Sequence, residues 1–177
     1  MGAVSTIRPL VRDDATALAE LYLANRDFLA SWEPIRPDDF FTEAGQLEII
    51  DGLLERQGRH EAYPQVILDQ HNNPVGRINL NNVIRGPFLS GGLGYWVSAT
   101  HNGQGLATTA VGAMRDLAFG ELGLHRLEAS TLLHNAGSQR VLERNGFARF
   151  GLAPEYLQIA GRWQDHVLFQ VTNPSVG

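Results

Sequence analysis

The sequence contains no cysteine among its 177 residues, and this absence limits both its architecture and its chemistry. A chain without cysteine has no disulfide framework and no thiol nucleophile. The sequence also lacks an apolar run long enough to span a membrane, and it shows no signal-peptide pattern. We therefore expect a cytoplasmic protein that does not insert into a membrane.

Positive charge is also scarce. Lysine and arginine together number 14 against 19 acidic residues, which gives a formal net charge of −5. This balance argues against a nucleic-acid partner and against an anionic membrane surface. The six histidines show no metal-ligand spacing, so we expect no metal.

The residues that are present describe an ordinary globular chain. Hydrophobic residues make up 44% and charged residues 19%, and the length suffices for one full core. No repeat, low-complexity tract or linker divides the sequence. We expect a single domain over residues 1–177, with a frayed tail at about 172–177.

Hydrophobic periodicity and turn signals predict the order β-αα-βββ-α-β-α-ββ, a mixed sheet with helices on both faces. The helices are expected at about 15–24, 42–58, 106–120 and 136–144. The strands are expected at about 5–11, 63–69, 75–83, 93–98, 126–132, 147–151 and 163–172.

The stretch from His101 to Met114 carries the clearest chemical signal. Gly103 and Gly105 follow a predicted strand and lead directly into a helix of small residues. The first amides of a helix have no intrahelical partner, and glycines let an anion approach the backbone closely. We interpret residues 103–108 as a phosphate cradle for a diphosphate.

Two other interpretations of this stretch remain open from the residues alone. The spacing Gly103-x-Gly105-x-x-Thr108 is a near miss to the dinucleotide fingerprint, and Glu128 lies roughly where a ribose-binding acid would. The motif lies in mid-chain, however, and a threonine replaces the third glycine. A purely structural strand-to-helix turn is the other alternative.

Several blocks of the sequence resemble one enzyme family. Asn102-x-x-Gly105-x-Ala107 is similar to the Q/R-x-x-G-x-G/A motif of the GCN5-related N-acetyltransferases (GNAT). The segments 135–138 (NAGS), 143–147 (ERNGF) and 156–166 resemble the branch that acetylates ribosomal proteins, the RimJ/RimL type. The likeness covers nearly the whole chain and implies a central, mostly antiparallel twisted sheet of about seven strands.

The resemblance implies acetyl-CoA as the acyl donor. Its pyrophosphate would bind the cradle, and its pantetheine arm would run beside the preceding strand as an added strand. One N–H of that strand, at Val97, would also stabilise the tetrahedral oxyanion. Asn135 matches the residue that hydrogen-bonds the arm; the alternative is a cap of the following helix, and both roles could hold together. The residues expected to bind the donor are Tyr95, Trp96, Val97, Gly103, Gln104, Gly105, Leu106, Ala107, Thr108, Asn135 and Ser138.

The catalytic groups are also expectations from the resemblance. Leu142 occupies the position where some relatives keep an acidic tyrosine, so Ser138 is the best candidate to hydrogen-bond the leaving thiolate. Glu155 matches the proposed base of the branch. Glu128 and Glu33 are the competing carboxylates.

The predicted function is therefore direct transfer of an acetyl group to a primary amine. The expected acceptor is the N-terminal α-amine of a protein, plausibly ribosomal, with Trp32, Glu33 and Tyr156 in the substrate wall. A small-molecule amine is the alternative acceptor, and a CoA-binding regulatory module without turnover is the alternative class. The chain is expected to be a monomer or a homodimer.

Overall fold

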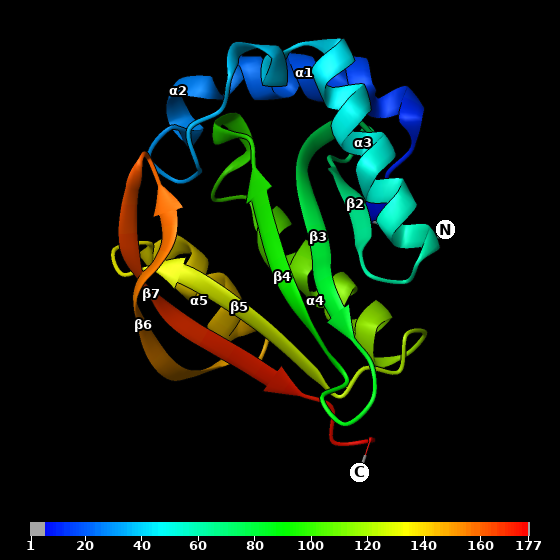
Figure 1. The fold of residues 1–177 in the computed structure, drawn as a ribbon, viewed down its shortest axis with the longest axis vertical. Helices are drawn as coiled ribbons and strands as arrows, with labels where there is room; N and C mark the ends of the chain where they lie inside the picture. Colours follow the sequence, from blue (N-terminus) through cyan, green and yellow to red (C-terminus); the bar gives the residue numbers. More distant parts are fainter. Residues whose placement is uncertain (1–5, 177) are drawn as a thin grey trace.

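A seven-stranded sheet with helices on both faces forms the centre of the molecule (Figure 1). The computed structural model describes residues 6–176. The strands are β1 (Ile7–Pro9), β2 (Tyr63–Leu68), β3 (Pro74–Ile84), β4 (Ser90–Val97), β5 (Arg126–Leu132), β6 (Ala148–Ile159) and β7 (Arg162–Thr172), in the spatial order β1-β2-β3-β4-β5-β7-β6. All neighbours are antiparallel except β4 and β5. The predicted mixed, mostly antiparallel sheet is confirmed.

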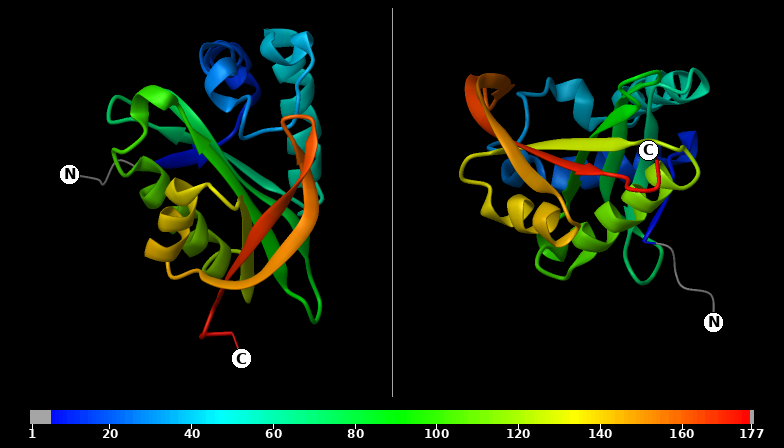
Figure 2. Two further views of the ribbon diagram at one scale, coloured as in Figure 1. Left: turned by 90° about the vertical axis from the view of Figure 1, so that its left-hand side faces the viewer. Right: turned by 90° about the horizontal axis from the view of Figure 1, so that it is seen from below.

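The α-helices are α1 (Ala15–Ala24), α2 (Arg26–Leu29), α3 (Glu43–Gly58), α4 (Leu106–Phe119) and α5 (Ala136–Arg144). Short 3₁₀ helices cover residues 12–14, 38–41 and 99–101. The two views in Figure 2 show α4 and α5 together on one face of the sheet and the N-terminal helices on the other.

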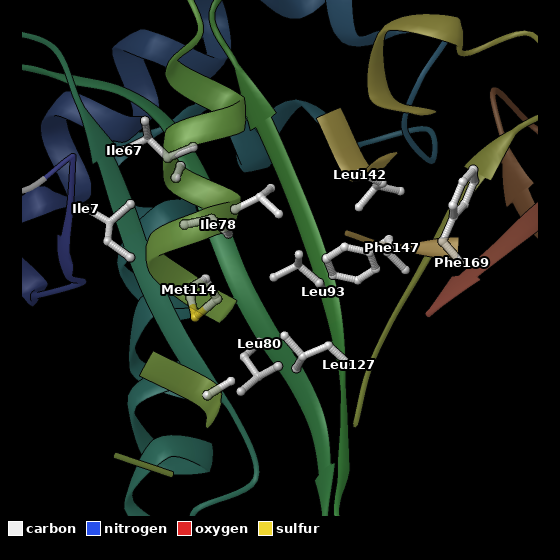
Figure 3. Close-up of a cluster of buried hydrophobic side chains, with 14 of the residues drawn as sticks. Ile7, Ile67, Ile78, Leu80, Leu93, Met114, Leu127, Leu142, Phe147 and Phe169 are labelled. Carbon is white, nitrogen blue, oxygen red and sulfur yellow. The ribbon is translucent and has the colours of Figure 1, made fainter. Parts of the chain in front are cut away.

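Two hydrophobic cores hold these layers together. Because successive side chains of a strand point to opposite faces, Ile67 of β2 packs toward α4 while Val66 packs toward α1 and α3. Figure 3 shows Ile67 and Ile78 gathered around Met114 of α4, all fully buried. The fully buried Phe169 extends this core to β7.

The sheet opens between β4 and β5. These two strands pair only from Ser90 to Gly92 with Arg126 to Glu128, although β4 continues to Val97. Beyond this point the two strands diverge, as Figure 1 shows. The C-terminal half of β4 still pairs with β3, but its edge toward β5 has no neighbouring strand, and the candidate site lies along this edge.

Local sequence signals set the ends of the helices. Thr42 caps α3 by accepting a hydrogen bond from the Gly45 amide, and α5 has the predicted bounds.

The C-terminal region differs from the expectation. β6 extends to Ile159, with irregular pairing between Ala153 and Leu157.

The chain continues past β7 along the connection between α4 and β5. Thr172 belongs to β7, and the next residue, Asn173, is buried. The Asn173 amide donates to the carbonyl oxygen of His125, just before β5, at 2.7 Å. Gly177 and the predicted first strand residue Ser5 lie outside the described residues.

Candidate active site

A cavity of about 570 Å³ lies where β4 and β5 diverge. Its walls come from α2, the end of β4, the turn before α4 with the first turn of that helix, and one face of α5 along its whole length. The predicted donor- and substrate-binding residues that line it are Trp32, Tyr95, Trp96, Val97, Gly103, Gly105, Leu106, Ala107, Thr108, Asn135 and Ser138. The structure therefore brings most of the predicted donor site to one place.

The phosphate cradle has the geometry of an anion site. Gly103 and Gly105 both adopt positive φ, 77° and 79°, and a Cβ added at either would meet no atom within 4 Å. The first helical hydrogen bond here is donated by Thr109 to the Gly105 carbonyl oxygen. Between residues 6 and 176, no acceptor is found for the six amides from Gly103 to Thr108. These donors at a helix N-terminus fit a diphosphate.

One predicted cradle residue turns away from the cavity. Gln104 is exposed, does not line the cavity, and donates its side-chain amide to the Thr100 carbonyl oxygen at 3.3 Å. Any contact it makes with a ligand would therefore come from its backbone amide.

Two arginines in the cavity wall were not predicted. Arg140 and Arg144 lie one turn apart on α5 and both line the cavity. Neither forms an ion pair within the described part of the chain. Their i, i+4 spacing was visible in the sequence, but the sequence did not show that this face of α5 turns toward the cradle. Their charge suits the phosphates of the donor.

Asn135 and Ser138 lie beside each other at the start of α5. The Asn135 side-chain oxygen accepts a hydrogen bond from the Ser138 amide at 3.1 Å, so the predicted cap is present. The Ser138 hydroxyl lies 2.7 Å from the hydroxyl of Tyr95, a contact that the sequence did not predict. Leu142 is fully buried in the core and offers no acid.

A second cavity, of about 260 Å³, adjoins the first at the end of β5. His134 lines both cavities, and its ring lies 5.3 Å from that of Trp32, centroid to centroid. Asp165 of β7 lines the second cavity. Sequence reasoning missed His134, because nothing in the local pattern separates it from a surface histidine before the α5 cap.

The three candidate carboxylates have different surroundings. Glu155 is exposed, has φ of 47°, lies in the irregular part of β6, and does not line either cavity. Its amide donates to Asp165 Oδ1 at 2.9 Å, which holds it next to the second cavity. Glu128 pairs with Arg126 at 2.6 Å on β5.

Glu33 is the most enclosed of the three. Burial raises the pKa of Glu33, while Arg36, whose Nε lies 3.7 Å from Glu33 Oε2, opposes this shift. The Glu33 carbonyl oxygen accepts a hydrogen bond from the Ala160 amide, which ties the predicted substrate loop to the β6–β7 hairpin. On that hairpin Tyr156 is exposed and its ring lies 5.7 Å from His166.

The described part of the chain offers neither a metal-binding cluster nor a membrane-spanning helix. No group of three or more histidine, cysteine or acidic side chains within 6–176 is arranged to hold a metal ion. None of the described helices is both long and apolar enough to cross a membrane.

The chain belongs to the GNAT acetyltransferase family. The family model for the acetyltransferase (GNAT) domain matches residues 5–148. The probable N-acetyltransferase YjcK of Bacillus subtilis is 38% identical over 174 residues, covering 98% of this chain and 96% of that protein. The Escherichia coli enzyme named as an N-acetyltransferase of alanine on ribosomal protein uS5 is 35% identical, covering 93% of this chain and 86% of its own.

A solved structure agrees with these relatives. The Mycobacterium smegmatis RimJ structure in complex with CoA-disulfide superposes with a TM-score of 0.91 at 32% identity, covering 96% of this chain and 82% of that one. The predicted family, its RimJ/RimL-like character and the enzyme class are confirmed. Since GNAT acetyltransferases use acetyl-CoA, the family also decides against the dinucleotide interpretation of the cradle.

Proposed function

We propose that this enzyme transfers the acetyl group of acetyl-CoA to the N-terminal α-amine of a ribosomal protein. The observation that supports this acceptor most directly is that one residue, His134, lines both cavities. A thioester bound along β4 would have its acetyl end in the first cavity, and an N-terminus held in the second cavity would approach it near His134. The name of the Escherichia coli relative, an enzyme acting on a ribosomal protein, supports the same class of acceptor.

The chemistry of the amine favours an N-terminus over a lysine. An α-amine has a pKa of about 7.7–8.0, so a useful fraction is neutral near pH 7, whereas a lysine has a pKa of about 10.4. The difference of about 2.5 units makes the lysine roughly 3.4 kcal/mol harder to deprotonate. A site whose proton acceptor is a single carboxylate is better matched to the α-amine.

We propose Glu155 as that base, with Ser138 at the leaving sulfur and the Val97 amide at the oxyanion. The choice is supported by the backbone amide of Glu155, which donates to Asp165 in the wall of the second cavity, and by the absence of a cationic partner for Glu155 among the described residues. Glu33 is the competing base, because burial raises its pKa and so makes it a better proton acceptor. Its ion pair with Arg36 opposes this effect.

A pair of variants separates the two carboxylates. Glu155→Gln should lower the rate near pH 7 by about 10²-fold, the usual scale of a positioned base. Much of this loss should return near pH 9, where the α-amine loses its proton unaided. Glu33→Gln serves as the matched control and should leave the pH profile unchanged. If Glu33→Gln gives the pH-dependent loss and Glu155→Gln does not, the base is Glu33.

The acceptor itself is identified by mass spectrometry. The protein is incubated with acetyl-CoA and a library of peptides with free N-termini, with the same peptides N-terminally blocked as the control. Acetylation of free N-termini is expected. Acetylation confined to small-molecule amines added in parallel would remove the protein acceptor from the proposal, and saturable acetyl-CoA binding without any product would indicate a module without turnover.

A further inference from the structure

Tyr95 connects β4 to α5 across the open part of the sheet. Its hydroxyl lies 2.7 Å from Ser138 Oγ, and it can also donate to the Ser138 carbonyl oxygen at 3.3 Å. The distance to Oγ is the usual one for a hydrogen bond between two oxygens, whereas 3.3 Å is long, so Oγ is the favoured partner. Pairing between β4 and β5 has already ended at Gly92, so this contact spans the divergence of the two strands. Both Tyr95 and Ser138 line the cavity in which the thioester is expected.

The direction of the hydrogen bond between the hydroxyls decides what Ser138 can do. Each hydroxyl has one proton and can both donate and accept. If the Ser138 hydroxyl donates to Tyr95, its proton is used and its oxygen can only accept. If Tyr95 donates to Ser138 Oγ, the serine proton is free to turn into the cavity. Only the second arrangement lets Ser138 donate to a negatively charged sulfur.

We propose that Tyr95 is a positioning residue for the acetyl transfer, which donates to Ser138 Oγ and thereby directs the serine proton toward the departing sulfur. In the step itself the C–N bond forms, the C–S bond breaks, and the electron pair of that bond goes to sulfur. The proton lost by the amine passes to the base, and the thiolate takes its proton from water. A tyrosine from β4 thus acts near the sulfur in a site where the buried Leu142 of α5 offers no acid.

The surroundings of Tyr95 keep it in the donating form. Burial raises the pKa of Tyr95 to about 12, although its hydrogen bond with Ser138 acts in the opposite direction. The hydroxyl therefore retains its proton throughout the neutral and mildly alkaline range. A chain of two hydroxyls in a partly desolvated site also polarises its last member, which strengthens the hydrogen bond to sulfur.

A double-mutant cycle tests this role. Tyr95→Phe should lower kcat by about tenfold, the scale of one hydrogen bond, with the KM for acetyl-CoA unchanged. Ser138→Ala should lower kcat by a larger factor. In the Ser138→Ala background, Tyr95→Phe should not lower kcat further, because the residue through which Tyr95 acts is absent. Tyr63→Phe is the matched control, since it removes a hydroxyl from another half-buried tyrosine packed against the same core.

A second measurement needs no acceptor, so it stands apart from the proposed substrate. The thiol of CoA bound to the protein is titrated by the ultraviolet absorbance of its thiolate, using CoA alone as the probe. A donor aimed at sulfur favours the thiolate, so Tyr95→Phe and Ser138→Ala should each shift its ionisation to higher pH. The proposal is overturned if Tyr95→Phe leaves both kcat and this titration unchanged, or if its effect is equally large without Ser138.

Discussion

Replacing Gly105 with valine tests the phosphate cradle most sharply. Gly105 lies at the N-terminus of α4 with φ of 79°, and an added Cβ would meet no protein atom within 4 Å. The new side chain would therefore enter the space that the cavity offers to a ligand. The change should leave a folded protein that no longer binds acetyl-CoA.

The magnitude follows from the amides that the ligand would lose. A hydrogen bond to a charged group contributes about 1.5–3 kcal/mol, so withdrawing two amides from a diphosphate costs about 3–6 kcal/mol. That corresponds to a Kd raised by about 10²–10⁴-fold. The backbone strain of a left-handed residue with a side chain adds roughly 1–2 kcal/mol of destabilisation.

Gly86 offers a matched control for the strain. It has nearly the same φ, 75°, and equally open space around its Cβ position, but it lies in the β3–β4 loop away from the cavity. Gly86→Val should lower the melting temperature about as much as Gly105→Val. Isothermal titration calorimetry with acetyl-CoA should then show a loss of affinity for Gly105→Val alone. Equal affinity in both variants would show that the cradle is misassigned.

Two further predictions concern stability. Acetyl-CoA at about 100 times its Kd should add roughly 2.7 kcal/mol to the free energy of unfolding and raise the melting temperature by about 5–11 °C, whereas NAD should leave both unchanged. A shift with NAD alone would contradict acetyl-CoA as the acyl donor. Asp14→Asn should destabilise the protein by about 1.5–3 kcal/mol near pH 7, because Asp14 accepts two hydrogen bonds from Arg8, at 2.7 and 2.8 Å. Burial raises the pKa of Asp14, but the hydrogen bonds from Arg8 and Val11 lower it by more. The stability that the Asp14 carboxylate contributes is therefore present above about pH 4 and is lost as the pH falls through the lowered pKa. In acid denaturation, the stabilities of the parent protein and Asp14→Asn should converge.

The parts of the site predicted from the sequence are those that depend on local signals. The bounds of α5 follow from the Asn135 cap at its start and Gly146 after its end. The cradle follows from two glycines whose positive φ is costly for other residues. Such features need only neighbours in the chain, and the structure places them where the pattern indicates.

The contacts that the sequence did not predict are those between segments far apart in the chain. Tyr95 and Ser138 are 43 residues apart, and their contact exists only because β4 and α5 face one cavity. The shape of β6 also escaped prediction, since its irregular pairing with β7 places Glu155 at positive φ. No propensity signal indicates a glutamate in that conformation. The buried Asn173, likewise, has its partners on the α4–β5 connection.

Acetyl transfer to an α-amine is the central claim, and one competition within a single peptide tests it most directly. The peptide has a free N-terminal alanine and one internal lysine, and fragment-ion mass spectrometry after limited turnover near pH 7 locates the acetyl group. The account predicts acetylation at the N-terminus, with the lysine unmodified until the α-amine is consumed. Acetyl found first on the lysine would contradict it.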